Sequence, residues 1–262
     1  MTVSKENPKR KRVATDPIEK VNQKGDDQFI QEHLCPSDPS WCSWTHPDTQ
    51  AAYSLSLVSA GRLGSADLDA CYNLIEETSR VDYESSTSGW KPVKKIAEMK
   101  SPELRYILVK NSEGDMRGFT SLMPTYEEGE PVVYCYEIHL KPELQRYVCL
   151  PHFPNIISQV VWIMVYFGAV VVDSALTSFR TGLSRLLMSF LESVAAHTPP
   201  IKKVMLTCFL SNQKALAFYK SFGFAQDPIS PVPKKLRYGR EFIPDYVIMS
   251  KTVESKPPLD TT

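Results

Sequence analysis

The stretch from Val132 to Leu187 constrains the fold of this chain more than any other. It begins with V-V-Y-C-Y-E-I-H-L (Val132–Leu140), an apolar, β-branched and aromatic run that predicts a buried strand leading into a turn. Further along, R-T-G-L-S-R-L-L-M-S-F-L-E (Arg180–Glu192) predicts a glycine turn that opens an amphipathic helix. A strand, a glycine turn and a helix N-terminus together favour a phosphate-bearing ligand, because free backbone N–H groups and the helix dipole both attract negative charge.

Composition sets only broad limits on function. The 262 residues are 42% hydrophobic and 23% charged with a formal net charge of zero, as in an ordinary soluble globular protein. Bulk charge therefore gives no argument for a nucleic acid or a membrane surface, and we expect no direct nucleic-acid binding. The six cysteines include no C-x-x-C pair and no histidine at zinc-ligand spacing, so we expect reduced intracellular thiols and no metal, with a disulfide or metal site as the alternative.

Both ends of the chain differ in character from the middle. Residues 1–27 are polar and basic, so we expect a disordered N-terminal tail and no signal peptide. Within it, P-K-R-K-R-V (Pro8–Val13) is typical of a nuclear-import signal, or is simply a solvated basic run. Residues 28–252 are expected to form one α/β (α+β) domain, and residues 253–262 a flexible C-terminal tail.

Hydrophobic periodicity predicts the elements of this domain. We expect a helix over 28–34, a proline- and tryptophan-rich connector over 36–47 and a first strand over 52–60. A helix capped by Ser65 or Asp67 follows, and then a polar loop over 81–91. Strands over 106–110 and 118–122 pair across a turn, and an acidic turn over 125–131 leads to the central strand. Strands over 203–209, 224–226 and 246–249 and a helix over 213–222 complete the domain.

The most specific local pattern is S-N-Q-K-A-L-A-F-Y-K-S-F-G-F (Ser211–Phe224) after a buried strand. Taken alone it is equally typical of an amphipathic helix that ends at Gly223 with a positive-φ cap. In this position it resembles the closing motif of the GNAT superfamily of acetyl-CoA-dependent N-acetyltransferases. The resemblance implies the GNAT fold, a mixed central sheet flanked by helices. It also implies that Asn212 holds the pantetheine region of acetyl-CoA, and that Tyr219 lies near the thioester sulfur as a general acid.

The same resemblance implies a pyrophosphate loop of the form Gln/Arg-x-x-Gly-x-Gly/Ala directly after the central strand. This chain matches it only if its two halves are joined as Gln145-Arg-Thr181-Gly182-Leu183-Ser184. The expected cofactor-binding residues are Ile138, His139 and Leu140 through their backbone, with Gln145, Arg180, Thr181, Gly182, Leu183, Ser184, Arg185 and Asn212.

Residues 147–180 interrupt this loop as an apolar insertion. Its apolar core, Val160–Val172, has 13 residues, and a membrane span needs about 20, so we expect no membrane span. One hypothesis is a translated, retained intron, because the residues at both borders can be encoded with fungal-type donor, branch and acceptor sequences, and removal in frame restores the loop. The alternative is a membrane-dipping or partner-binding insert.

A closer resemblance is to the NatD-type N-terminal acetyltransferases, which modify the α-amine of histones 2A and 4. It is carried by Tyr134-Cys135-Tyr136-Glu137, by Lys202–Thr207, and by Tyr83 with Gly89-Trp90-Lys91, and it covers roughly residues 26–250. It implies direct attack of the α-amine of an N-terminal Ser on the thioester, histone tails and acetyl-CoA as partners with the ribosome as a further one, and a nuclear and cytoplasmic location.

Residue roles follow from this resemblance. Glu137 is the expected general base, with Tyr136 and Tyr219 as the other catalytic residues, although a strand Glu is often only a solvated side chain. The residues expected to line the peptide channel are Tyr83, Glu127, Tyr136, Thr207 and Tyr246. The family has an acidic residue where this chain has Thr125. Cys135 is expected to be a small buried hydrophobe, and His139 to lie beside the cofactor. Two other functions stay open: acetylation of a lysine or small-molecule amine, and a catalytically impaired acyl-CoA- or histone-tail-binding protein.

Overall fold

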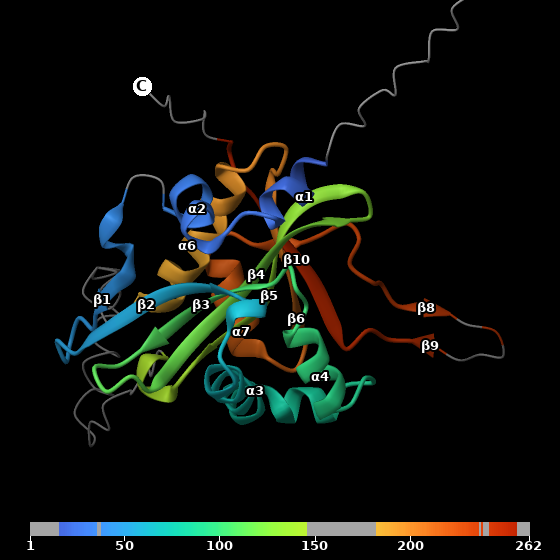
Figure 1. The fold of residues 1–262 in the computed structure, drawn as a ribbon. Coiled ribbons are helices and arrows are strands. Elements are labelled where there is room, and N and C mark those ends of the chain that lie inside the picture. The colour runs from blue at the N-terminus through green and yellow to red at the C-terminus, as the bar shows by residue number, and fades with distance from the viewer. Residues whose placement is uncertain (1–15, 36–37, 146–181, 236, 238–240, 256–262) are drawn as a thin grey trace, which may run out of the picture.

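The computed structural model describes residues 16–35, 38–145, 182–235, 237 and 241–255. Its centre is an eight-stranded sheet in the order β1-β2-β3-β4-β5-β6-β10-β7, with a separate pair β8-β9 (Figure 1). Neighbouring strands are antiparallel except β5 and β6, which are parallel, so the sheet is mixed. The predicted α/β (α+β) class is confirmed.

The strands are β1 (Ser43–Thr45), β2 (Ala52–Ser59), β3 (Arg105–Lys110), β4 (Met116–Glu127), β5 (Glu130–Leu140), β6 (Lys203–Phe209), β7 (Ala225–Gln226), β8 (Lys234–Lys235), β9 (Glu241–Phe242) and β10 (Tyr246–Thr252). The α-helices are α1 (Pro17–Asn22), α2 (Asp26–Phe29), α3 (Ser65–Ser85), α4 (Pro92–Met99), α6 (Leu183–Ala196) and α7 (Gln213–Ser221). Shorter turns are the π-helix η1 (Ile30–Leu34) and the 3-10 helices η2 (Pro39–Cys42), η3 (Ala60–Arg62) and η4 (Pro142–Leu144).

Helices cover both faces of the sheet, and strand β3 shows how the sequence serves both. Ile107 and Val109 point into an apolar cluster with α1, α2, α6 and α7, whereas Tyr106 and Leu108 point into a second cluster with α3 and α4. Because successive side chains of a strand alternate between faces, a strand buried on both sides is apolar throughout. We call these the α6 face and the α3 face.

A one-residue bulge in β5 changes which side chains lie on each face. Leu122 of β4 pairs with Cys135, and the adjacent Ser121 pairs with Glu137, so Tyr136 is the extra residue. A bulge of this kind shifts the alternation by one position. Cys135 therefore belongs to the α6 face, while Tyr136 packs on the α3 face and Glu137 bonds to Lys95 of α4 on that side.

Strands β5 and β6 stay together for only a short distance. Their parallel pairing covers Val133 with Val204, Tyr134 with Met205 and Cys135 with Leu206. Beyond Cys135 no further β5–β6 pairs occur within the described residues, so the two strands separate from Tyr136 onward. The two strands therefore splay apart next to Ile138.

Helix α6 begins where the sequence predicts. Gly182 is its N-cap with φ +77°, a left-handed conformation that glycine adopts without the steric cost of a Cβ. Its buried residues Leu183, Leu187, Leu191 and Val194 recur every three or four positions and pack into the α6 face.

Several predicted boundaries differ from the structure, beginning with the tail over 1–27, in which residues 17–22 form a helix. Within it, α1 forms because Asp16 accepts hydrogen bonds from the backbone N–H groups of the first turn and Pro17 follows at the first helical position. Ile18 and Val21 then bury themselves in the α6 face. At the other end, the N–H of Val253 bonds to Lys202, so the expected flexible tail does not begin there.

The region over 65–99 also differs from the prediction. The N-cap of α3 is Gly64 without a side-chain bond, and neither Ser65 nor Asp67 caps it. The predicted polar loop over 81–91 is helical to Ser85, because Arg80 bonds to glutamates one turn away on either side.

Three smaller predictions are also corrected. The chain has a strand before 52–60, namely β1, inside the predicted connector. The predicted acidic turn over 125–131 is only a two-residue hairpin turn, Glu128-Gly129, with φ positive at both positions. The short helix α4, which was not predicted, begins at Pro92.

The interruption over 147–180, Arg180, Thr181 and the basic run over 8–13 lie outside the described residues. Within the described residues, no helix has the length and apolar character needed to cross a membrane. The same part of the chain holds no group of three or more His, Cys, Asp or Glu side chains arranged to bind a metal ion.

Candidate active site

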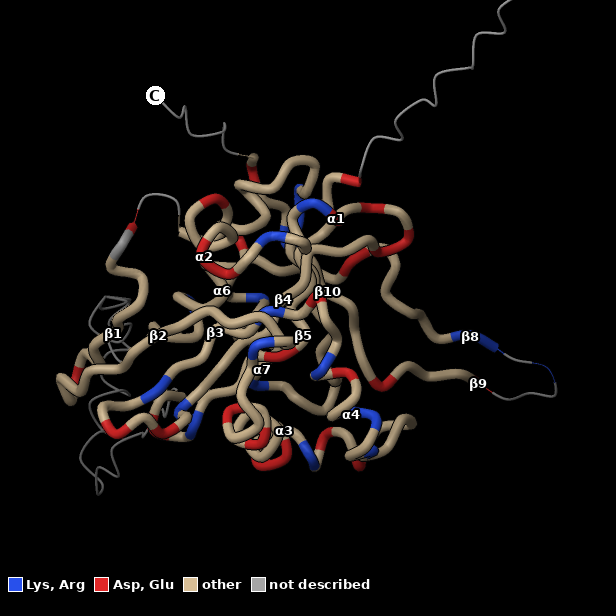
Figure 2. The backbone as a smooth tube through the Cα atoms, in the orientation of Figure 1, with Lys and Arg blue, Asp and Glu red and all other residues tan. Residues whose placement is uncertain are grey.

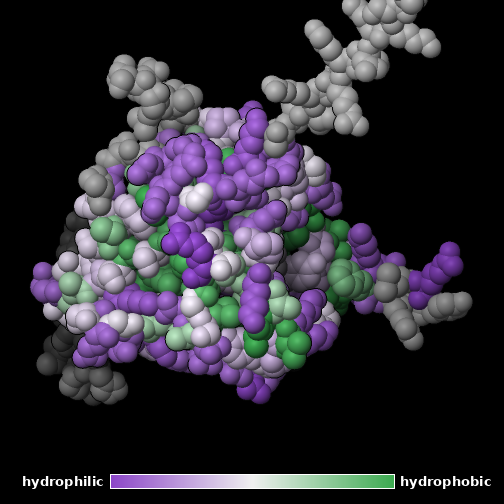
Figure 3. All heavy atoms as spheres, in the orientation of Figure 1, coloured by the Kyte–Doolittle hydropathy of each residue, from purple (hydrophilic) through white to green (hydrophobic). Residues whose placement is uncertain are grey.

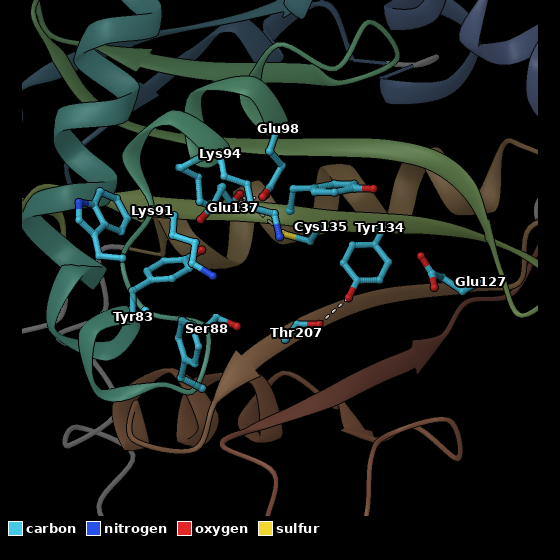
Figure 4. A pocket seen from close by; sticks show the side chains of 15 residues that line it. Tyr83, Ser88, Lys91, Lys94, Glu98, Glu127, Tyr134, Cys135, Glu137 and Thr207 are labelled. Atoms are coloured by element: carbon cyan, nitrogen blue, oxygen red, sulfur yellow. Dashed lines mark hydrogen bonds and ion pairs between the residues drawn. The ribbon is translucent and has the colours of Figure 1, made fainter.

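A cavity of about 450 Å³ opens on the α3 face where β5 and β6 separate. Side chains from the end of α3, the following loop, α4, β5 and β6 converge on it (Figure 4). In the space-filling view the surface is hollowed next to α4 (Figure 3). The residues that line the cavity are Tyr83, Ser88, Gly89, Trp90, Lys91, Lys94, Lys95, Glu98, Glu127, Tyr134, Cys135, Tyr136, Glu137, Thr207 and Phe209. Four of the five predicted channel residues are among them.

Glu137 is the most buried acid in this cavity, with 9% of its surface exposed. Its Oε1 accepts a hydrogen bond from Lys95 Nζ at 2.7 Å, and its Oε2 lies 2.6 Å from His139 Nε2. Burial alone would raise the pKa of Glu137, but Lys95 and His139 outweigh it and lower this pKa to about 2. The side chain is therefore a carboxylate near neutral pH.

The ring of His139, which was predicted to lie beside the cofactor, is buried between Glu137 and α3. Its Nδ1 lies 2.6 Å from the hydroxyl of Thr78, which itself donates to the carbonyl of Leu74 at 2.7 Å. A carbonyl only accepts, so the one Thr78 proton goes to Leu74, and the Thr78 oxygen accepts from His139 Nδ1–H. The ring therefore faces the Glu137 carboxylate with Nε2, at 2.6 Å.

Tyr83 forms one wall of the cavity from the last turn of α3. Its ring lies edge-on to Phe209 of β6 at 4.8 Å and to Trp90 at 5.2 Å between centroids. The loop between α3 and α4 is tied to the start of β10, because the N–H of Thr87 donates to the carboxylate of Asp245. This wall is therefore fixed from both sides.

Tyrosines and glutamates line the opposite wall. The rings of Tyr134 and Tyr136 lie 5.2 Å apart, and the hydroxyl of Tyr134 lies 2.6 Å from that of Thr207 on β6. Burial raises the pKa of Tyr134 to about 12, so its hydroxyl keeps its proton. Glu127, from the hairpin end of β4, completes this side (Figure 4).

Two of the predicted catalytic and channel residues, Tyr246 and Tyr219, lie outside the cavity lining. Tyr246 is next to it, as the Cα partner of Phe209 across β10 and β6. Tyr219 of α7 is 7% exposed and packs in the α6 face against Phe218 and Phe224. Burial raises the pKa of Tyr219 well above its usual value, so the phenol holds its proton.

Asn212 begins α7 and binds the protein on both sides of its amide. Its Oδ1 accepts from the N–H of Ala215 at 3.0 Å, and its Nδ2 donates to Asp82 at 3.1 Å. Ser211 donates to the same carboxylate at 2.6 Å. Asp82 therefore connects the turn before α7 with the helix turn that carries Tyr83.

Apart from Asn212, the predicted cofactor residues that are described lie where the central strand β5 ends and α6 begins. Gln145 follows η4, and its side chain donates to the carbonyl of Leu140 at 2.6 Å. Beyond Gly182, Leu183 is fully buried, and Arg185 donates to the hydroxyl of Ser221 at 3.1 Å. Ser184, in the first turn of α6, is half-buried. The first N–H groups of α6 have no partner within the helix, which is the arrangement that binds phosphate oxygens.

The structure gives little support for a cysteine nucleophile. Four cysteines of the described chain, Cys35, Cys71, Cys135 and Cys208, are free thiols. Burial raises the pKa of Cys135 to about 12, so its thiol stays protonated and is a poor nucleophile.

The sequence reasoning missed the residues of α4. Lys95 and Glu98 line the cavity, and Lys95 bonds directly to Glu137. The segment P-V-K-K-I-A-E-M looks like an ordinary charged helix surface. The available signal was the four-residue spacing of Lys95 and Met99, which are the two buried residues of the helix.

Comparison with known proteins agrees with this architecture. Residues 164–224 match the model of the acetyltransferase (GNAT) family, a range that includes α6, β6 and α7.

Among solved structures, the chain is similar to the ribosomal-protein-S18-alanine N-acetyltransferase from Escherichia coli, with 18% identity over 79% of this chain and 99% of that one and a TM-score of 0.41. It is also similar to Arabidopsis thaliana NAA60 in complex with a bisubstrate analogue, with 8% identity over 77% and 100% and a TM-score of 0.46. A third is a variant of the spermidine N-acetyltransferase SpeG from Vibrio cholerae, with 15% identity over 76% and 93% and a TM-score of 0.40.

The mixed sheet, its flanking helices, the splay of β5 from β6 and the family match over α6–α7 agree with one another. The chain has the GNAT acyltransferase fold.

Proposed function

We propose that this protein is an N-terminal protein acetyltransferase, which transfers the acetyl group of acetyl-CoA to the α-amine of the N-terminal Ser of histones 2A and 4. The GNAT fold and family match support an acetyl-CoA-dependent acyltransferase. The narrower substrate rests on the NatD-type resemblance and on the residues that surround the cavity.

One observation carries the proposal: the buried carboxylate of Glu137 lies in a tyrosine-lined cavity at the point where β5 leaves β6. In this fold the thioester is expected at the splay, so an amine that enters the cavity meets the carboxylate and the thioester together. Such proximity accelerates the reaction, because the entropy of bringing the two groups together and orienting them is already lost on binding.

The reaction needs little from the protein beyond orientation and proton acceptance. The neutral amine nitrogen forms a bond to the acetyl carbon, the carbon–sulfur bond breaks, and the CoA thiolate takes up a proton. An α-amine has a pKa of about 7.7–8.0, so a substantial fraction is neutral near pH 8. Glu137, whose pKa is about 2, accepts the hydrogen bond of the amine or of a relaying water but holds a proton only briefly. Tyr219 is the proposed donor to the thiolate.

The acidic rim suits a basic tail behind the reactive amine. Glu127 and Glu98 line the cavity, and acidic residues gather at the tip of the β4–β5 hairpin (Figure 2). Carboxylates pair with Arg or Lys side chains, so a peptide with a small first residue followed by basic residues matches this cavity. Thr125, which replaces an acid of the family, is not among the lining residues.

The end of β5 and the start of α6 are proposed to hold acetyl-CoA through main-chain groups. The described part supplies the splayed strand over 138–140, the left-handed Gly182 and the first turn of α6. Gln145 and Asn212 are the side chains proposed to contact it.

An acetyl-transfer assay tests the proposal. The peptide Ser-Gly-Arg-Gly should be acetylated on its α-amine, and the same peptide with a blocked N-terminus should not be. Equal labelling of both would exclude α-amine specificity and favour a lysine or small-molecule amine as the acceptor. Histone H4 added to the full-length protein in a pull-down would identify a tail-binding protein that lacks activity.

The impaired-protein alternative depends on residues 147–180. Comparing the full chain with a chain that lacks them tests it, because excision joins Gln145-Arg146 to Thr181-Gly182. Equal activity would show a tolerated insert, whereas activity in the shortened chain alone would show that the insert silences the enzyme. Transcript reads across this junction decide whether the segment is a retained intron, and reads that always contain it would end that hypothesis.

The proposed location is the nucleus and the cytoplasm, which suits histone tails as partners both before and after import. Replacing the basic residues over 9–12 with alanine should reduce nuclear accumulation of a fluorescent fusion. An unchanged distribution would show that this run is not the import signal.

A further inference from the structure

A lysine occupies a core position of α4. Lys95 and Met99 are the two buried residues of this helix, and only 6% of the Lys95 side chain is exposed. Burying an ammonium group costs several kcal/mol unless it is paired, so a helix that only covered the sheet would carry an apolar residue there. The position of this charge therefore asks for an explanation.

Lys95 contacts both walls of the candidate active site. Its Nζ lies 2.7 Å from Glu137 Oε1 and 3.0 Å from Glu98 Oε1, and 5.0 Å from the ring centroid of Tyr83. The contact to the ring is a cation–π interaction, which strengthens when the cation is desolvated. One ammonium group thus joins the carboxylate on β5 to the aromatic wall on α3.

The contacts of the Glu137 carboxylate show which of its acceptor positions remain available to a ligand. Oε2 is held by His139, which is fixed in turn by Thr78 of α3, and Oε1 is held by Lys95. A carboxylate has about four lone-pair positions, so these two bonds orient the group and leave acceptor positions for a ligand in the cavity. A carboxylate without Lys95 would be held through Oε2 alone, so its last torsion, which has broad minima, would be less restricted.

We propose that Lys95 is a positioning residue for acetyl transfer, which fixes the Glu137 carboxylate and the Tyr83 wall relative to each other. This inference rests on the proposed function, because it assigns the role of Lys95 in orienting an amine acceptor. Lys95 acts through Glu137 and does not touch the reacting atoms. Burial opposes its charge, but Glu137, Tyr83 and Glu98 together raise the pKa of Lys95, so it remains cationic throughout the working range.

The first test compares three single variants of the full chain. Lys95→Met removes the charge and keeps much of the apolar stem, Lys95→Arg keeps the charge, and Lys100→Met makes the same chemical change at an exposed position one residue beyond α4. Lys95→Met should lower kcat on the order of 10- to 100-fold, as misplacement of a reacting group does. KM for acetyl-CoA should stay within about twofold, since Lys95 bonds to the side chains of Glu137 and Glu98, neither of which is proposed to hold acetyl-CoA. Lys95→Arg should recover part of the loss, and Lys100→Met should match the wild type.

A double-mutant cycle distinguishes positioning of Glu137 by Lys95 from a purely structural contribution of Lys95 to the fold. If Lys95 acts through Glu137, the double variant Lys95→Met/Glu137→Gln should have the kcat of Glu137→Gln alone. The double variant also removes both buried charges, so it should fold even if Lys95→Met by itself does not. Melting temperatures of all variants show whether any loss of activity comes from unfolding.

Two results would overturn the inference. One is a folded Lys95→Met variant whose kcat equals that of Lys100→Met. The other is a full extra loss in the double variant relative to Glu137→Gln. The wild-type arm reports separately on the function: a wild-type protein that acetylates no peptide, lysine or polyamine acceptor refutes both proposals, whereas an active wild type with an equally active Lys95→Met refutes this inference alone.

Discussion

The two faces of the sheet are built from different chemistry. On the α6 face, side chains from α1, α6 and α7 form a cluster whose buried members are almost all aliphatic or aromatic. On the α3 face, an apolar cluster surrounds a connected polar group made of Thr78, His139, Glu137 and Lys95. The first face stabilises the domain mainly by apolar burial, and its buried Arg105 bonds to main-chain carbonyls at the end of α1, whereas on the second face the buried charges lie at the cavity. The comparison teaches where substitutions should affect stability and where they should affect rate.

The largest expected effect comes from Glu137→Gln on the α3 face. It should lower kcat on the order of 10²- to 10⁴-fold, the range typical of a proton acceptor, with acetyl-CoA binding nearly unchanged. The deficit should shrink as the pH rises past about 8, because the α-amine then deprotonates without help. Steady-state kinetics from pH 6 to 9.5 measure it, with the exposed turn variant Glu113→Gln as control. A deficit that is constant over this range would argue against proton acceptance.

On the α6 face, Leu191→Ala should lower stability and leave the catalytic rate nearly unchanged. It removes a fully buried side chain and should lower the free energy of unfolding by about 2–5 kcal/mol. The kcat of the folded fraction should stay close to that of the wild type. Urea unfolding measures the first quantity, and Ser189→Ala, exposed on the same helix, provides the matched control. A loss of kcat without a loss of stability would break the division between the faces.

The charge of Glu137 also predicts how stability depends on pH. Its pKa is about 2 in the folded state against an ordinary value of 4.5, so its contribution is present above pH 4.5 and is lost as the pH falls toward 2. Over that window the wild type should lose stability more steeply than Glu137→Gln, by up to about 1.4 kcal/mol per pH unit. Urea unfolding at several pH values compares them. Parallel curves would mean that Glu137 is not paired in solution.

The smallest effect is expected at the edge of the α3 face, from Asp82→Ala. This change releases Ser211 and Asn212 from α3 and so loosens the turn that carries Tyr83. Loss of partly exposed hydrogen bonds costs about 1 kcal/mol, which corresponds to a rise of roughly fivefold in KM for the peptide. The exposed Asp69→Ala on the same helix should change nothing, and an Asp82→Ala enzyme with unchanged KM would show that this link is unimportant.

Much of the fold could be predicted because its elements carry strong local signals. The apolar strand before Gln145, Gly182 at the start of α6, and Gly223 after α7 each have one favoured structure, and all three are found. The N-terminal helix α1 was missed because its six residues include only two large apolar side chains, Ile18 and Val21, which are too few to show a periodicity. Its order comes from packing: the buried guanidinium of Arg105 donates to the carbonyls of Asn22 and Lys24 at its end.

Only those site residues that belong to recognisable sequence motifs could be predicted. Glu137, Tyr83 and Thr207 were named from family-like motifs, and they line one cavity. Lys95 was not, because a lysine in a charged helix is usually solvated, and only the packed structure shows its partner 42 positions away. The link between Asn212 and Asp82 spans 130 positions and has no local pattern either.

The bulge at Tyr136 makes this protein sensitive to the shape of β5 as well as to the identity of its residues. Cys135 and Glu137 are two positions apart, which in a regular strand would place them on the same face, and the bulge places them on opposite faces. A change that straightened β5 without altering its length would therefore turn the acid toward the side occupied by the α6 leucines. The local conformation of the strand, and not only the residues that it carries, is part of the candidate active site.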